Sequence, residues 1–216
     1  MSGFSKNWQN KQDQSGGGKG LSGLLRSSAP IRPQIDKATR DISLLISRLG
    51  AAEAKIKTRD ETIFRKVVFA MQKGDRDHAA IYANELSEVR KVGSTVTGAK
   101  LALEQVSMRL QTITDLGDIA ATLAPTVAVV RGVKAGLGTV LPNAQGELDE
   151  ISSLLSSTLV EAGSVGGTSL NFGAANDEAE KVLEEASAVA YQRMEQELPR
   201  VPATAARSEE DEGLLA

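Results

Sequence analysis

Residues 34–70 read QIDKATRDISLLISRLGAAEAKIKTRDETIFRKVVFA, and their pattern decides the fold. Aliphatic and small side chains recur every seven residues, at Ile35, Ile42, Leu49, Ile56, Ile63 and Ala70, with Ala38, Leu45, Ala52 and Val67 between them. A seven-residue apolar repeat places these side chains on one face of an α-helix. The stretch therefore predicts one amphipathic helix of about 40 residues, on the order of 60 Å long.

The turn sequence KGDRD, residues 73–77, is expected to end this helix and start another. Gly74 is a good helix terminator, and Asp75 or Asp77 can cap the helix that follows. A second ladder with the same period comes next, formed by Tyr82, Val89, Val96, Leu103 and Leu110, with Leu86 and Val106 widening it. Two long helices joined by a short turn form an antiparallel hairpin, so the sequence predicts an all-α fold built on this hairpin.

Proline and glycine set the expected limits of the second helix. No proline occurs between Pro33 and Pro125, so this helix is expected to continue to about Leu123. Gly93 and Gly98 lie within it, and each costs up to about 1 kcal/mol relative to alanine. Their presence indicates either a bend or a close approach of another helix.

The chain is expected to divide into four parts along its length. These are a flexible basic segment, 1–33; a helical core, 34–162, with the hairpin at about 34–124 and shorter helices at about 126–162; a Gly/Ser linker, 163–175; and an acidic helix with a disordered tail, 176–216. The separate helices after Pro125 are expected at about 126–140, 144–162 and 177–198.

Composition argues against several classes of function. Aromatic residues make up 3% of the chain and hydrophobic residues 41%, mostly Ala, Leu, Val and Ile, which suits long helices packed side by side. There is no cysteine, which excludes disulfides and thiolate metal sites and fits a reduced cytosolic setting. His78 is the only histidine, and GKGLSG at 18–23 follows no strand, so neither a metal nor a dinucleotide site is indicated. We therefore expect no enzyme activity and no cofactor.

The most apolar stretch, residues 119–141, is not expected to cross a membrane. It contains Pro125, Arg131 and Lys134, and it has no uncharged run of 18 residues. A mobile helix with an apolar face that docks or opens suits it better. Residues 1–20 are polar and lack the apolar segment of a secretory signal.

Charge is distributed unevenly. Residues 1–100 carry 18 Lys and Arg against 10 Asp and Glu, whereas residues 101–216 carry 7 against 18. On the first helix, five cations fall within about 40° of one another, which forms a basic stripe of Arg48, Lys55, Arg59, Lys66 and Lys73. The stripe predicts binding to anionic lipid headgroups; nucleic acid is not expected, because no DNA-reading motif accompanies it.

Two further groups of residues extend this hypothesis. Phe4 and Trp8 lie four apart beside lysines and could insert two rings among headgroups if the segment became helical. The last helix has an apolar face that can dock on another element, formed by Val182, Leu183, Ala186, Val189, Ala190 and Met194. Its acidic residues Glu178, Glu180, Glu184 and Glu185 are expected to face the basic half when the chain closes, which predicts autoinhibition.

Several stretches resemble the ESCRT-III family of membrane-remodelling polymer subunits, in its archaeal cell-division, CdvB-type branch. They are RDISLLISRL (40–49), RDETIFRKVVFAM (59–71), DHAAIYANELSEVRKV (77–92) and ALEQVSMRLQTITDLGDI (102–119). The resemblance covers about 34–162 well and the tail in outline. It implies a helical polymer subunit that binds copies of itself and of its paralogues.

The tail sequence LPRVP, residues 198–202, resembles the family's proline-rich motif that binds MIT domains. Leu198, Pro199, Val201 and Pro202 occupy its four defining positions. The implied partner is the MIT domain of the CdvC-type AAA ATPase that extracts subunits from the polymer. Only 14 residues follow Pro202, too few for the winged-helix-like segment through which some relatives contact CdvA. Direct contact with CdvA is therefore doubtful, and recruitment by a paralogue is expected.

The resemblance implies a function in membrane constriction or scission during archaeal cell division. The expected location is the cytoplasmic face of the membrane at the mid-cell division site. Two alternatives stay open at this point: a BAR-like coiled-coil dimer that senses curvature, and a soluble helical adaptor. A discrete dimer would differ from the polymer in forming no open filament.

Overall fold

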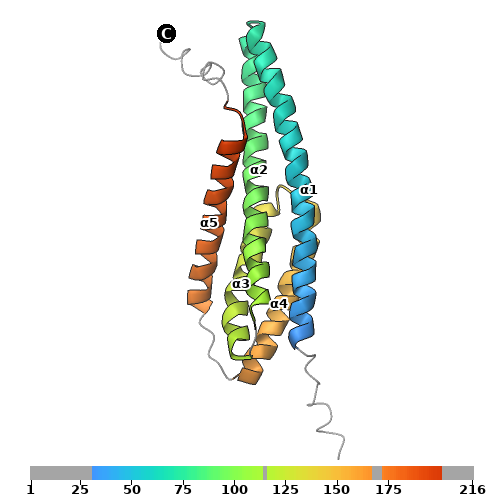
Figure 1. Cartoon of the computed structure of the whole chain (residues 1–216), viewed down its shortest axis with the longest axis vertical. Helices are drawn as coiled ribbons and strands as arrows, with labels where there is room; N and C mark the ends of the chain where they lie inside the picture. The colour runs from blue at the N-terminus through green and yellow to red at the C-terminus, as the bar shows by residue number, and fades with distance from the viewer. Residues whose placement is uncertain (1–30, 114–115, 167–171, 201–216) are drawn as a thin grey trace, which may run out of the picture.

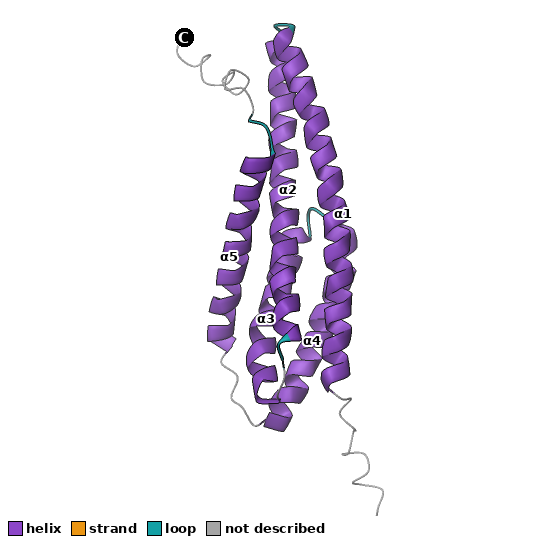
Figure 2. Ribbon diagram, viewed as in Figure 1, coloured by secondary structure: helices purple, strands orange, loops and turns teal. Residues whose placement is uncertain are grey.

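The computed structural model describes residues 31–113, 116–166 and 172–200, and within these ranges the chain is helical without strands (Figures 1 and 2). The elements are α1 (Ile31–Gln72), α2 (Arg76–Gln111), α3 (Leu116–Leu137), the short 3-10 turn η2 (Pro142–Ala144), α4 (Gln145–Gly166) and α5 (Phe172–Glu197). The predicted all-α fold is confirmed.

The long hairpin of α1 and α2 is confirmed, with its turn where the sequence predicts it. Gly74 has a φ of 75°, a conformation that costs other residues more than glycine. Asp75 caps α2, because its side chain accepts a hydrogen bond of 3.2 Å from the backbone N–H of His78. The His78 ring also bonds this carboxylate, and these hydrogen bonds lower the pKa of Asp75.

The apolar ladders of the hairpin are buried in two separate clusters. Toward the open end, Ile42, Leu45 and Leu49 are at most 1% exposed and join a large core with α3 and α4. Toward the turn, Ile63, Val67 and Leu86 form a small cluster of their own. The distal half of the hairpin is thus packed almost entirely by its own two helices, which reach well beyond α3 and α4 in Figure 1.

The expectation that α2 continues to Leu123 is wrong. The helix ends at Gln111, where Thr112 donates from its backbone N–H and from its hydroxyl to the Arg109 carbonyl. This end allows α3 to turn back and pack along α2, and the apolar area buried there outweighs a longer helix. The sequence carries a signal that proline counting missed: residues 112–118, TITDLGD, are rich in β-branched and turn-forming types.

Pro125 does not separate two helices, so the expected helix start at 126 is wrong. It lies inside α3, where it removes one backbone N–H and costs about 3 kcal/mol. The adjacent Thr126 hydroxyl donates 2.7 Å to the Thr122 carbonyl. Leu123 and Val130 are completely buried on the same helix, and burial of these and other core side chains exceeds the cost of the proline.

Helix α3 is the central helix of the bundle. Residues 119–137 are long and apolar enough to span a membrane by length and composition, but 56% of that window is buried inside the protein. Its apolar side chains pack against α2, α4 and α5. The stretch predicted to dock an apolar face therefore serves as core.

Three other helix limits differ from the prediction. α1 begins at Ile31 rather than 34 and includes Pro33, which is tolerated in a first turn because no helical N–H is needed there. α4 extends to Gly166 and α5 starts at Phe172, so helix occupies most of the expected linker at 163–175. Ala162 and Ala175 are buried near these ends, and their burial favours helix despite the neighbouring glycines.

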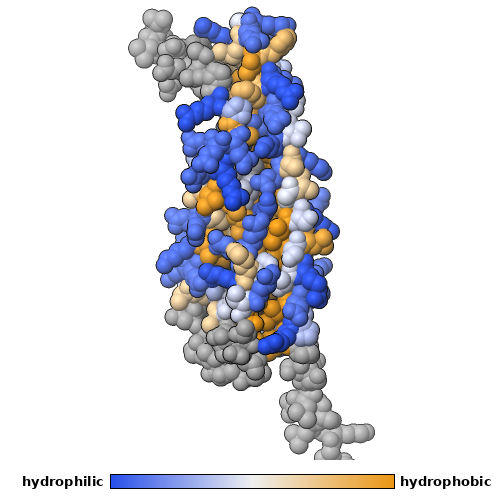
Figure 3. Space-filling model, in the orientation of Figure 1, coloured by the Kyte–Doolittle hydropathy of each residue, from blue (hydrophilic) through white to orange (hydrophobic). Residues whose placement is uncertain are grey.

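Polar contacts fix α4 to the open end of the hairpin. The Gln34 amide donates 2.9 Å to the Glu161 carboxylate and accepts 2.7 Å from the Thr158 hydroxyl. Thr158 is fully buried, and its hydroxyl oxygen also lies 2.7 Å from the Leu154 carbonyl oxygen, so it has a partner within α4 as well. Hydrophilic side chains cover most of the face seen in Figure 3, with hydrophobic groups between them.

The register of α1 predicts that truncating a buried leucine and truncating an exposed leucine have different effects on stability. Leu49→Ala removes a side chain that is 1% exposed, and it should lower the free energy of unfolding by about 2–5 kcal/mol. Leu44→Ala is the matched control, because Leu44 is 54% exposed and should change stability by no more than about 0.5 kcal/mol. Urea unfolding followed by circular dichroism measures both. Equal effects of the two variants would contradict the assigned register of α1.

Candidate functional site

Helix α5 lies along the hairpin and covers a face of α2 and α3, which we call the α5 dock (Figure 1). The residues that α5 buries there are mostly small: Ala175, Ala179, Val182, Ala186 and Ala190. Their spacing of three or four residues forms one narrow stripe along the helix. The predicted apolar face of the last helix is therefore confirmed as a docking face.

Glycines on the hairpin side allow α5 to approach closely. A methyl group added at Gly98 would stand 3.6 Å from the Ser187 Cα atom and 3.7 Å from the Ala186 carbonyl oxygen. One added at Gly132 would overlap the end of the Leu183 side chain. Gly93 lies where Met194 meets the hairpin. Of the two readings of Gly93 and Gly98, close approach of another helix is confirmed.

Ion pairs hold α5 at both ends of the dock. Near its start, Glu178 pairs with Arg109 of α2. Near its end, Glu197 accepts 3.0 Å from the Lys57 ammonium of α1, and this hydrogen bond raises the pKa of Lys57. Both pairs are largely exposed and screened by solvent, so they set the position of α5 more than the strength of its contact.

A buried charge pair lies beneath the C-terminal end of α5. Asp60 of α1 is 1% exposed, and its two oxygens accept from Arg90 of α2 at 2.7 Å to Nε and 3.3 Å to Nη2. The same Nη2 donates 2.8 Å to the backbone carbonyl oxygen of Pro199. One guanidinium therefore joins both hairpin helices to the segment that follows α5.

A second polar pair lies two turns away in the hairpin seam. The Glu53 carboxylate accepts 2.8 Å from the Thr97 hydroxyl and 2.9 Å from the Lys100 ammonium. Burial raises the pKa of Glu53, but these hydrogen bonds and the charges of Lys100 and Arg193 together lower it below its usual range.

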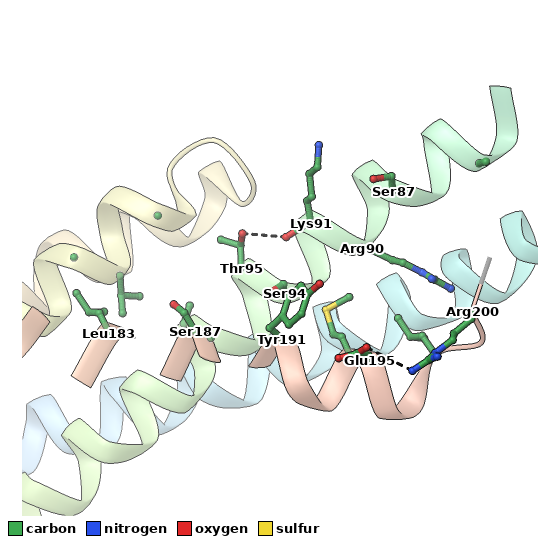
Figure 4. Close-up of a pocket in the computed structure, with 18 residues that line it drawn as sticks. Ser87, Arg90, Lys91, Ser94, Thr95, Leu183, Ser187, Tyr191, Glu195 and Arg200 are labelled. Carbon is green, nitrogen blue, oxygen red and sulfur yellow. Dashed lines mark hydrogen bonds and ion pairs between the residues drawn. The ribbon is translucent and has the colours of Figure 1, made fainter. Parts of the chain in front are cut away.

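Two cavities flank the end of α5. A groove of about 970 Å³ runs between α2 and α5, and a smaller cavity of about 350 Å³ lies among α1, α2 and the last turn of α5. Leu198 lines both. Figure 4 shows Arg90 extending from α2 toward the segment after α5 that holds Arg200.

The acidic residues predicted to hold the closed chain do so only in part. Glu178 faces a hairpin arginine as predicted. Glu180, Glu184 and Glu185 are exposed and form no ion pair within the described ranges. Close packing of small residues, with one ion pair near each end, holds α5 on the hairpin.

The predicted basic stripe lies exposed on α1, but several of its cations have partners inside the chain. Arg48 pairs with Glu147 of α4, and Arg59 bonds Glu85 at 2.9 Å. The Lys66 ammonium stands 5.5 Å from the Tyr82 ring centre and that of Lys73 stands 4.3 Å from the Phe69 ring centre. Lys55 is exposed. Carboxylates of the chain thus balance two of the five positive charges of the stripe.

Some of the predicted motif residues lie within the part of the chain that the structure describes, and others lie outside it. Leu198 and Pro199 lie at the end of α5 and against α2, respectively. Val201, Pro202, Phe4 and Trp8 lie outside the described residues.

Three residues of the site were missed from the sequence: Glu53, Asp60 and Arg90. A signal was present, because Glu53 and Asp60 are seven residues apart, and so are Arg90 and Thr97. The same period as the apolar ladders places these polar side chains along the edge of the hairpin seam. Polar residues that recur every seven positions beside an apolar ladder thus indicate polar contacts between the two helices of the hairpin.

The chain is similar to two proteins of Sulfolobus acidocaldarius. It is 36% identical over 200 residues to Cell division protein B1, an overlap of 93% of this chain and 90% of that protein. It is 29% identical over 186 residues to Cell division protein B, which is 84% of this chain and 71% of that protein. No family model matches the chain. No solved structure matches it either.

Enlarging Gly98 should release α5 while leaving the hairpin folded. Gly98→Leu drives a side chain into the backbone of α5, so α5 should become cleavable by protease at least about tenfold faster, with little loss of helix content. The control is Gly50→Leu on α1, where an added methyl meets nothing within 4 Å. Limited proteolysis with mass spectrometry locates the cuts. Equal protection of α5 in both variants would show that close approach at Gly98 is unimportant.

The Glu53 pair predicts a dependence of stability on pH. A folded-state pKa below the unfolded value of about 4.3 stabilises the fold above that pH, and the stabilisation is lost as the pH falls through the lowered pKa. Glu53→Gln should therefore lower stability at pH 7 and cost progressively less in acid, with an effect reduced by solvent screening at this partly exposed site. Urea unfolding at several pH values measures the difference, with the exposed Glu61→Gln as control. A cost that is the same at every pH would refute the assignment.

Proposed function

The chain belongs to the CdvB-type branch of the ESCRT-III family, and on that premise we propose that it is a subunit of a membrane-remodelling polymer. Its relatives support a role in archaeal cell division. Within that role, the polymer would constrict or sever the membrane at the division site, at its cytoplasmic face. Copies of this chain and of its paralogues would form the filament.

The observation that carries the proposal is the way α5 sits on the hairpin. Its contact consists of alanines against glycines, with exposed ion pairs at the ends. The side chains that α5 buries are mostly alanine and its end ion pairs are exposed, so α5 would leave this surface while α1 to α4 keep their contacts with one another. The docked form is then the closed subunit, and removal of α5 frees the dock for contacts between copies.

Membrane attachment is assigned to the basic stripe on α1. Its five cations are exposed along one helix, Arg48, Lys55, Arg59, Lys66 and Lys73. Each cation near an anionic surface contributes about 1 kcal/mol, and salt screens it beyond a Debye length of about 8 Å. The N-terminal pair Phe4 and Trp8 is proposed to add two rings among the headgroups.

Turnover of the polymer is assigned to a partner and not to this chain. The motif formed by Leu198, Pro199, Val201 and Pro202 would bind the MIT domain of a CdvC-type AAA ATPase. Prolines restrict the backbone and bias the segment toward an extended form, so binding costs less entropy. Force would come from ATP hydrolysis by the partner, and this chain would act as a structural subunit.

Removal of α5 should convert the closed subunit into one that assembles. A chain that ends at Gly166 keeps α1 to α4 and loses residues 167–216. It should form long filaments or tubes at a concentration about tenfold lower than the intact chain, as seen by negative-stain microscopy. A discrete dimer, or truncated protein that assembles no more readily than the intact chain, would refute the proposed autoinhibited polymer.

The same two proteins test the membrane assignment in cosedimentation. Binding to vesicles of anionic lipid should exceed binding to neutral vesicles and should fall steeply with salt. Lys55→Glu, on the exposed stripe, should weaken it, whereas Lys91→Glu on α2 is a matched control outside the stripe. Binding that is indifferent to salt and to Lys55→Glu would refute attachment through the stripe.

A further inference from the structure

We infer that Arg90 is a latch that holds the partner-binding motif shut, so that the closed subunit hides the start of the motif from its partner. The inference rests on the proposed function of LPRVP as a recognition motif. It adds that docking of α5 and recognition by the partner exclude each other. The latch is the contact of Arg90 with Asp60 and with the carbonyl oxygen of Pro199.

Asp60 holds the Arg90 side chain in place. The carboxylate is 1% exposed and takes two hydrogen bonds from the guanidinium, at 2.7 and 3.3 Å. A buried carboxylate needs such a partner, because leaving it unpaired is costly. The planar guanidinium is thereby fixed, with Nη2 free to donate a further bond in one direction only.

That remaining direction leads to the tail. Nη2 donates 2.8 Å to the Pro199 carbonyl oxygen. The Leu198 N–H donates 3.0 Å to the Met194 carbonyl, which continues α5 into the motif. Glu197 is bonded to Lys57 one residue earlier. Each of the three successive residues 197–199 thus forms a hydrogen bond, and two of these bonds join the segment to the hairpin.

These hydrogen bonds hold Leu198, the first aliphatic residue of the motif, where a partner cannot bind it. Leu198 is half-buried and lines both cavities beside the end of α5, between α2 and α1. A partner that takes Leu198 and Pro199 in an extended form must first break the Arg90 bond and unwind the last turn of α5. The apparent affinity of the intact chain is then reduced by the fraction of time that the latch is open.

Coupling of this kind works in both directions. If docking of α5 weakens recognition by a given factor, recognition must weaken docking by the same factor. A partner bound to LPRVP therefore favours release of the end of α5. Recognition and opening of the subunit become one step, and a free subunit is a poorer target than an opened one.

The test compares the intact chain with a peptide of residues 190–207, using the isolated MIT domain of a CdvC-type ATPase as probe. Fluorescence anisotropy should show that the peptide binds at least about tenfold more tightly, because a hydrogen bond to a charged group contributes a factor of about ten or more. Arg90→Lys preserves a charge for Asp60 but not the forked geometry, so it should bring the intact chain close to the peptide. Arg59→Lys is the matched control, since Arg59 bonds Glu85 and not the tail.

The ion pair between Lys57 and Glu197 gives a second set of variants for the same binding experiment, and in this set the change can be reversed by exchanging the two charges. Lys57→Glu and Glu197→Lys should each raise the affinity of the intact chain for the MIT domain, and the double exchange should restore the weak binding. Leu198→Asp with Val201→Asp should abolish binding of the peptide. Equal affinities of the native intact chain and the peptide would overturn the latch.

A readout without the partner separates failure of the latch from failure of the proposed function. The chain has no cysteine, so spin labels can be placed at Ser87→Cys, which lines the groove on α2, and at Gln196→Cys, which is exposed in the last turn of α5. Arg90→Lys and Glu197→Lys should broaden the distance distribution, whereas Arg59→Lys should not. If the peptide fails to bind the MIT domain, the motif assignment falls and these distances alone decide the latch. Distances that stay narrow in both latch variants would overturn it whatever the partner does.

Discussion

The apolar seam between α1 and α2 is the constraint on which the rest of the structure depends. Helices of 42 and 36 residues meet along a stripe only one or two side chains wide, so most of each helix surface stays uncovered. At the open end α3 and α4 cover part of it and build a large core. Nearer the turn only a small cluster forms, and the hairpin extends alone. One end is thus a folded body and the other a rigid arm.

The sequence predicted the parts that follow from local periodicity. The seven-residue repeat through Ile42 and Leu49 fixes which face of α1 is buried. Gly74 fixes the position of the turn between the two long helices. The errors occurred where tertiary packing outweighs local preference. Pro125 lies inside α3 because side chains on both sides of it are buried, a fact that no local rule contains. The end of α2 at Gln111 likewise depends on α3 packing back along it.

The candidate site divides in the same way. The apolar face of α5 and the glycines it meets were readable as patterns, because small residues at helical spacing indicate close approach. The contact of Arg90 with Pro199 was not readable, because residues 109 positions apart meet only after three helix reversals. Glu53 and Asp60 are an intermediate case. Their heptad spacing places them along one edge of the first helix, but it does not identify the residues with which they pair.

The hairpin seam and the α5 dock differ in the size of the side chains that they bury. The seam buries leucine, isoleucine and valine side chains, each contributing about 1.5–3 kcal/mol. The α5 stripe buries four alanines and one valine, and a methyl group contributes only about 0.8 kcal/mol. Its end ion pairs are exposed and weakened by solvent screening. The α5 dock therefore buries smaller side chains than the seam does, which is the property that the proposed release of α5 requires.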